Sequence, residues 1–234
     1  EETLKSYEEA LRIAREIGDK RGEGDNLGRL GVVYKNLGRN EEAIKSFEEA
    51  LNITREIGDK RGEGNHLGNI GTVYIDLGQL EESLKYLQQS IEIAREIGNK
   101  RNEGINLGNL GDIFLRLNRL KDSKIHLLQA IEICDESLPV AGGAFRGSLA
   151  LLYARQGNIE DAVIALEVGE PLVSVFSTEH GKFLCIKAKV YHLAKRPKEA
   201  EKALEQAKGI ATEGNVTEDS ELGKAIAEAK TFFK

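Results

Sequence analysis

The sequence IGDKRGEG occupies residues 17–24 and returns unchanged at residues 57–64. A third copy, IGNKRNEG, occupies residues 97–104 with two changes. The segments behind each copy are also related, because Leu27, Leu67 and Leu107 are each followed by glycine. Similarity at a fixed interval of 40 residues is typical of solenoids, in which supersecondary units stack on one another. The repeat therefore predicts a stack of such units.

The first half of each unit has the pattern of an amphipathic helix. Within residues 20–37, apolar side chains recur at spacings of three and four, at Leu27, Leu30, Val33, Tyr34 and Leu37. This spacing places them on one face of an α-helix. Gly38 follows, and glycine is the usual left-handed residue behind a helix.

The second half of each unit predicts another helix. Its apolar positions, within residues 40–57, are Ala43, Ile44, Phe47, Ala50, Leu51, Ile53 and Ile57. Gly58 is expected to end this helix, and Asp59 can cap the next one. Each unit is therefore predicted to be two antiparallel helices joined by short turns.

Two further columns indicate how the helices pack. Gly31, Gly71 and Gly111 fall inside predicted helices, where glycine costs about 1 kcal/mol relative to alanine. Their recurrence predicts a neighbouring helix too close for a side chain. The aromatic column is Tyr34, Tyr74, Phe114, Tyr153 and Tyr191. From it we expect Tyr74 to be a core residue.

The pattern Leu30-Gly31-x-x-Tyr34, with Gly38, Ala43, Phe47 and Ala50, resembles the tetratricopeptide repeat (TPR). The 40-residue unit is similar to the variety found in Pins-type spindle-orientation adaptors and in bacterial signalling proteins. The resemblance implies an all-α fold, a right-handed superhelical solenoid of antiparallel helix pairs. It also implies a scaffold for protein binding.

The repeat divides the chain into seven predicted parts of a single TPR array. They are the second helix of a truncated repeat (1–18), three repeats (19–58, 59–98 and 99–138), two degenerate repeats (139–176 and 177–214) and a C-terminal capping helix (215–234). In the degenerate part, Pro139, Gly142 and Gly143 are expected to interrupt the start of the fourth unit. Lys187 stands where earlier units have Leu30 and Ile70.

The N-terminal segment is predicted to be the second helix of a repeat whose first helix is absent. Residues 1–11 align with residues 41–51, and the chain contains no methionine, so we interpret it as a fragment of a longer array. Such a helix is expected to expose an apolar face. This face, formed by Leu4, Tyr7, Leu11 and Ile13, predicts self-association through the N-terminal helix.

Composition excludes several classes of protein. The chain has 234 residues, 40% of them hydrophobic, and a net charge of -6. A nucleic-acid partner would call for a basic excess, which is absent. No apolar run approaches the roughly 20 residues of a membrane span, so no membrane partner is expected. Cys134 and Cys185 are expected to be reduced thiols in the core of a cytoplasmic protein.

The sequence carries no catalytic or metal-binding pattern. The four histidines, at 66, 126, 180 and 192, lack metal-ligand spacing and are interpreted as surface residues. We therefore expect no enzyme activity and no cofactor or metal.

A second stripe on the first helices faces away from the apolar one. The candidate binding residues in it are Arg21, Asp25, Arg29, Arg61, Asn65, Asn69, Thr72, Arg101, Asn109 and Asp112. By the resemblance, first helices line the concave groove, so this stripe would form the floor of a peptide-binding groove. Asparagine both donates and accepts, and arginine offers a fork of donors, as peptide capture requires.

Other interpretations of these positions stay open. The arginines could be a solvated face, or could pair with Glu23, Glu63 or Glu103. Gly28, Gly68 and Gly108 lie beside the stripe and could admit a ligand backbone or serve helix packing. The function predicted from these features is a protein-interaction module that binds a peptide or helix of a partner protein. The alternative is a regulatory or sensing segment of a larger signalling enzyme, a kinase or nucleotide-binding ATPase.

Overall fold

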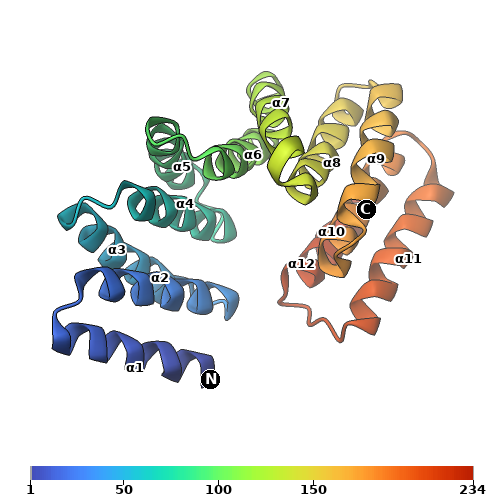
Figure 1. Cartoon of the computed structure of the whole chain (residues 1–234). Helices are drawn as coiled ribbons and strands as arrows, with labels where there is room; N and C mark the ends of the chain where they lie inside the picture. The colour runs from blue at the N-terminus through green and yellow to red at the C-terminus, as the bar shows by residue number, and fades with distance from the viewer. Residues whose placement is uncertain (1, 234) are drawn as a thin grey trace. The chain divides into compact units, whose positions relative to one another are not determined.

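The computed structural model describes residues 2–233, which form α-helices and no strand (Figure 1). The helices are α1 (Glu2–Ile17), α2 (Lys20–Asn36), α3 (Asn40–Glu56), α4 (Lys60–Asp76), α5 (Leu80–Glu96), α6 (Lys100–Arg116), α7 (Leu120–Ser137), α8 (Pro139–Arg155), α9 (Ile159–Val173), α10 (Ser177–Leu193), α11 (Pro197–Glu213) and α12 (Glu221–Phe232). The prediction of an all-α fold of helix pairs is confirmed. None of the described helices is long and apolar enough to cross a membrane.

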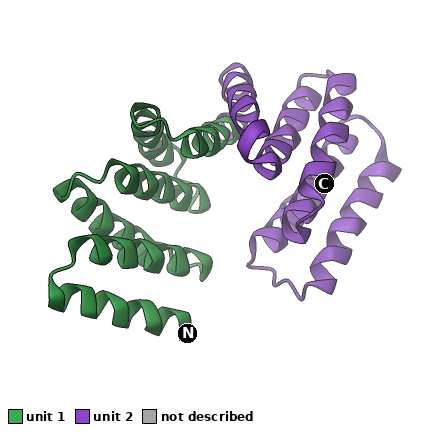
Figure 2. Ribbon diagram, viewed as in Figure 1, with its two compact units in different colours: residues 1–113 green, residues 114–234 purple. Residues whose placement is uncertain are grey.

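The chain forms two compact units, residues 1–113 (unit 1) and 114–234 (unit 2), and the boundary falls inside α6 (Figure 2). In unit 1 the apolar faces of successive helices form two buried clusters. One holds Leu11, Leu27, Leu30, Ala50 and Ile53, and the other Ala43, Phe47, Leu51, Leu67, Ile70, Val73 and Ile93. These are the residues that the spacing of three and four places on the apolar stripes.

The turns between helices follow the predicted chemistry. Gly58 has a φ of 71°, a left-handed conformation that costs glycine little. The next residue, Asp59, is the N-cap of α4, and its carboxylate accepts a hydrogen bond from the Gly62 amide at 3.0 Å. This bond satisfies an amide that the helix itself leaves open.

An ion-pair cluster joins α1 to α2, α3 to α4 and α5 to α6. Arg55 of α3 and Lys60 both donate to Glu63 of α4, at 2.8 and 3.0 Å. Burial acts to raise the pKa of Glu63, but these hydrogen bonds outweigh it, so that its pKa lies below the ordinary value. The same arrangement recurs one repeat earlier and one later, at Glu23 with Arg15 and Lys20 and at Glu103 with Arg95 and Lys100.

The glycines inside the first helices mark close helix contacts, as predicted. A Cβ on Gly31 would lie 2.6 Å from the Phe47 ring, and one on Gly71 would lie 2.7 Å from Leu87. Within the aromatic column Phe114 is buried, whereas the four tyrosines are half-buried. Tyr74 is half-buried and stacks on Tyr86 of α5, with ring centroids 5.4 Å apart. Tyr74 therefore packs against the edge of the buried cluster and is not fully buried, as a core residue would be.

The prediction of an exposed apolar face on the N-terminal helix is wrong. Leu4, Tyr7 and Leu11 pack onto the cluster that contains Leu27 of α2, and Leu11 is only 8% exposed. Of the predicted face, Ile13 alone is exposed, at 45%. The face is covered because α2 presents its own apolar residues to α1. The argument for self-association through this face is removed with it.

Unit 2 accommodates its irregular residues inside regular helices. Pro139 occupies the first turn of α8, where a missing amide hydrogen costs nothing, and Gly142 and Gly143 lie within the helix. A Cβ on Gly143 would lie 2.8 Å from the Gly169 carbonyl oxygen of α9. The expected interruption at this point is therefore wrong, because the glycine instead allows α8 and α9 to touch.

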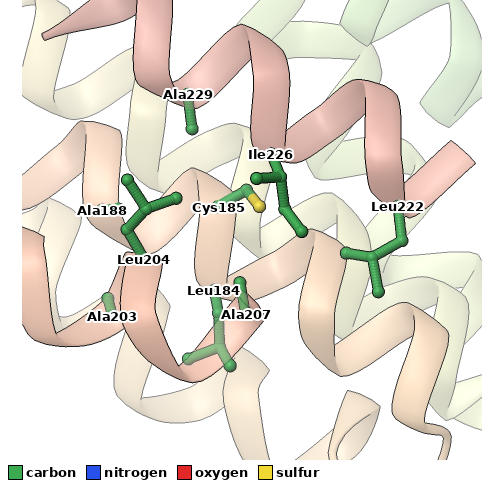
Figure 3. Packing of buried hydrophobic residues seen from close by; sticks show 9 residues of the cluster. All are labelled: Leu184, Cys185, Ala188, Ala203, Leu204, Ala207, Leu222, Ile226 and Ala229. Carbon is green, nitrogen blue, oxygen red and sulfur yellow. The ribbon is translucent and has the colours of Figure 1, made fainter. Parts of the chain in front are cut away.

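The last helix covers the end of unit 2. α12 packs against α10 and α11, and Leu222 and Ile226 join Leu184 and Cys185 in one buried cluster (Figure 3). Cys134 and Cys185 are both buried and form no disulfide, as expected, and burial raises the pKa of Cys185 to about 11. Lys187 is accommodated by an ion pair with Glu170, whose carboxylate lies 2.6 Å from its ammonium.

Candidate functional site

The ten predicted site residues all lie in unit 1, on the three first helices α2, α4 and α6. We call this set the first-helix stripe. Arg21, Asp25, Arg29, Arg61, Asn65 and Arg101 are exposed, and Asn69, Thr72, Asn109 and Asp112 are half-buried. Helices α2 and α4 are in contact, and Asn102 of α6 donates a hydrogen bond to Asn65 of α4. The stripe therefore runs across neighbouring helices.

The arginine column does not pair with the glutamates two residues further along the chain. Those glutamates are already engaged by the ion-pair clusters described above. Within residues 2–233, Arg21, Arg61 and Arg101 form no ion pair. The pairing alternative is thus wrong, and three guanidinium groups with a full set of donors stand at 40-residue intervals on an exposed face.

The central amides of the stripe are also open. Across the described residues, the side chains of Asn69 and Asn109 make no hydrogen bond to the protein. Asn69 is involved only through its backbone oxygen, which accepts from the Thr72 hydroxyl at 2.8 Å. Thr72 is therefore turned toward its own helix. Arg29 lies over the Tyr7 ring of α1, 5.8 Å from its centroid.

The glycines beside the stripe serve helix packing. Gly28 and Gly68 are buried, and a Cβ on Gly28 would lie 2.6 Å from the His66 ring. At Gly68 the corresponding neighbour is Asn106, at 3.1 Å. The ligand interpretation of these two glycines is wrong, because the next first helix fills the space above them.

His66 and Asn106 are the residues that sequence reasoning missed. Asn106 donates to the Ser90 hydroxyl, which donates to the Gly64 carbonyl, so both are satisfied in the core. His66 is only 7% exposed, its Nδ1 has no hydrogen-bond partner, and burial lowers its pKa. The prediction of surface histidines is thus wrong for His66. The sequence does contain a signal for this position, because it is polar in three consecutive repeats, beginning with Asn26.

Two cavities lie between second helices, and the stripe lines neither. The α3/α5 cavity, of about 410 Å³, is lined by Glu48, Leu51, Asn52, Arg55, Leu67, Glu82, Lys85, Tyr86 and Gln89. The α7/α9 cavity, of about 360 Å³, is lined by Leu128, Ile131, Arg146, Leu149, Tyr153, Asp161, Ile164, Ala165 and Val168. In the described part of the chain, no group of three or more His, Cys, Asp or Glu side chains is placed to hold a metal ion.

Solved structures with the same fold span nearly the whole chain. BtubC (BKLC) from P. vanneervenii is 16% identical over 92% of each chain, with a TM-score of 0.73. A Rap protein complexed with Competence and Sporulation Factor is 16% identical over 98% of this chain and 68% of its own, with a TM-score of 0.70. YrrB, described as a TPR protein with an unusual peptide-binding site, is 15% identical over 95% and 98%, with a TM-score of 0.54.

No curated protein matches the chain by sequence. The family model described as "Tetratricopeptide repeat" matches residues 1–56 and 62–136, which is more than half of the chain. The helix pairs, the glycines at the helix contacts and this match agree, and the chain belongs to the tetratricopeptide repeat family.

Proposed function

We propose that the chain is a protein-interaction module that binds a peptide or helix of a partner protein on the first-helix stripe, and that it is not an enzyme. The observation that carries the proposal is the repetition of unengaged polar groups. Arg21, Arg61 and Arg101 have no ion-pair partner within the described residues, and the Asn69 and Asn109 amides have no hydrogen bond there. A ligand backbone would meet such donors and acceptors on successive helices, about 10 Å apart.

Two of the proteins with similar structures support the same function. YrrB is described as having a peptide-binding site, and the Rap structure contains a bound factor. We also propose that the chain is divided into the seven parts of a TPR array given above, and that the first-helix stripe lies on a concave surface. The alternative, a regulatory segment of a larger signalling enzyme, gains no support from the comparisons.

The test begins with peptides selected on the wild-type chain from a displayed peptide library. Their affinities are then measured for the N69A/N109A variant and for the control N52A/Q89A, which removes two amides from the exposed second helices. The control is expected to melt near the wild-type temperature, because exposed positions change stability by about 0.5 kcal/mol or less. The same is expected of N69A/N109A, because these two half-buried side chains make no hydrogen bond within the described residues. We expect the first variant to bind about tenfold more weakly, since each lost amide leaves a polar group of the peptide unpaired.

A control variant that loses as much affinity as N69A/N109A would place the peptide on the second helices instead. Full binding by a folded N69A/N109A variant would overturn the proposed site. Unfolding of that variant would show that the two asparagines are structural.

A further inference from the structure

The α7/α9 cavity of unit 2 opens on an apolar surface. Leu128 of α7 and Ile164 and Val168 of α9 line it and are 44%, 52% and 49% exposed. Ile125, one helical turn from Leu128, is 54% exposed. Single exposed apolar residues are ordinary, but a contiguous group around a cavity marks an interaction surface.

The α3/α5 cavity of unit 1 is the matched reference for this surface. Its residues stand 80 positions earlier on the first lining helix and 79 positions earlier on the second. Leu128 thus corresponds to Glu48, Ile164 to Lys85 and Val168 to Gln89. The same place in the repeat is therefore polar in unit 1 and apolar in unit 2.

The floor of the cavity has also changed. In unit 1 the aromatic side chain of Tyr86 lines the cavity, and its ring stacks on Tyr74. The corresponding residue in unit 2 is Ala165, so this second ring is missing and only Tyr153, the counterpart of Tyr74, lines the cavity with an aromatic side chain. Three polar-to-apolar changes and one loss of bulk at equivalent positions are what a groove for an apolar ligand requires.

The charges around the groove identify the kind of ligand. Asp161 lines it, and Glu160 and Glu167 are exposed on the same face of α9. Two cations lie near the groove and both are engaged: Arg146 is held by both oxygens of Asp135, at 2.6 and 2.7 Å, and the Lys124 ammonium lies over the Tyr153 ring, 4.8 Å from its centroid. An apolar groove with acidic margins complements a partner that is apolar in the centre and basic at the edges.

We propose that the α7/α9 groove docks a basic amphipathic helix of another protein, with apolar side chains against Leu128, Ile164 and Val168 and lysines or arginines beside Glu160, Asp161 and Glu167. Helices bind grooves of this kind through residues spaced by three, four and seven. The surface is separate from the first-helix stripe and does not depend on the function proposed for it.

The test uses two model helices of about 14 residues, near the minimum length for a helix. One has a leucine stripe and lysines elsewhere, and the other has the same stripe and glutamates. Both are titrated by fluorescence anisotropy against the full chain and against L128E/I164K/V168Q. This variant installs the unit 1 residues and leaves the net charge unchanged, so general attraction to the acidic protein is the same in both. We expect the lysine helix to bind, the glutamate helix to bind about tenfold more weakly, and the variant to lose about tenfold in affinity for the lysine helix.

Equal binding of the lysine helix by the wild type and a folded variant would overturn the proposal, as would equal binding of both helices by the wild type. If circular dichroism shows that the triple variant is unfolded, L128Q/V168Q replaces it, with the same expected loss. Analytical sedimentation of the chain alone tests whether a second copy of the chain occupies the groove. A wild-type dimer that L128E/I164K/V168Q converts to a monomer would assign the groove to a second copy, and would also overturn the proposal.

Discussion

At the scale of single residues, small side chains decide how closely the helices approach. Gly31 has the Phe47 ring where its Cβ would be, and Phe47 is fully buried. Gly209, in the interior of α11, has no atom of another part of the chain within 4 Å of that point. The two glycines thus have the same helix propensity and opposite packing environments.

We therefore expect Gly31→Ala and Gly209→Ala to change stability in opposite directions. The first should destabilise the chain by about 1–3 kcal/mol, because the rigid ring must move. The second should stabilise it by up to about 1 kcal/mol through helix propensity. Urea unfolding measures both. A stabilising Gly31→Ala would mean that α2 and α3 are further apart than described.

The buried side chain of His66 is expected to make the stability of the chain depend on pH, because burial lowers its pKa. Burial lowers the pKa of His66 in the folded chain, so the unfolded chain takes up the proton first as the pH falls below about 6.5. Its contribution is therefore constant at high pH and decreases as the pH falls below that value, by up to about 1.4 kcal/mol per pH unit.

His66→Asn is the matched variant, because Asn106 occupies the equivalent position one repeat later. The difference in unfolding free energy between wild type and variant should be constant above about pH 7. Below about pH 6 the wild type should lose stability relative to the variant. Chemical denaturation across that range tests the sign. A difference independent of pH would show that His66 titrates equally in both states.

At the scale of helices, the repeated clusters of one glutamate with an arginine and a lysine connect consecutive pairs. Glu63 is mostly buried, whereas Arg55 and Lys60 are about half exposed, so the net contribution should be modest. Because the pKa of Glu63 is lowered in the folded chain, this contribution is present above the unfolded value of about 4.3. It is lost as the pH falls through the folded value.

Glu63→Gln should therefore cost about 1 kcal/mol at pH 7 and progressively less in acid. Glu92→Gln, on the exposed side of α5, is the control for removing one negative charge, because Glu92 forms no ion pair or hydrogen bond within the described residues. Thermal unfolding at several pH values gives the comparison. An equal cost at pH 7 and at about pH 3 would show that the carboxylate charge is not what joins α3 to α4.

At the scale of the whole molecule, the C-terminal helix protects the end of unit 2. Leu222 is 1% exposed and lies in the cluster with Leu184 and Cys185 (Figure 3). The thiol of Cys185 is covered, and its pKa is raised to about 11, so it should react slowly with a thiol reagent at neutral pH.

Leu222→Ala should lower stability by about 2–5 kcal/mol and speed the reaction of Cys185 with Ellman's reagent about tenfold or more, because α12 would open more often. The experiment is done with Cys134→Ala, so that one thiol reports. The partner measurement, with Cys185→Ala, follows Cys134 on α7. Equal acceleration of both thiols would show that unit 2 opens as a whole and that α12 is no separate cap.

The sequence by itself determined the helices, their pairing and the residues of each face. Local rules suffice for this: spacings of three and four define a stripe, Gly58 ends one helix, and Asp59 begins the next. The stripe of exposed polar residues on first helices followed from the same periodicity. Its role in binding stays a proposal.

Only the tertiary structure decided what covers each face. The apolar side of α1 is covered by α2, His66 is buried over Gly28, and the residues beside Ala165 remain exposed. Periodicity shows which residues share a face, but burial depends on the neighbour that the fold brings to it. For this reason the sequence alone does not predict the α7/α9 groove, whose residues come from the three helices α7, α8 and α9.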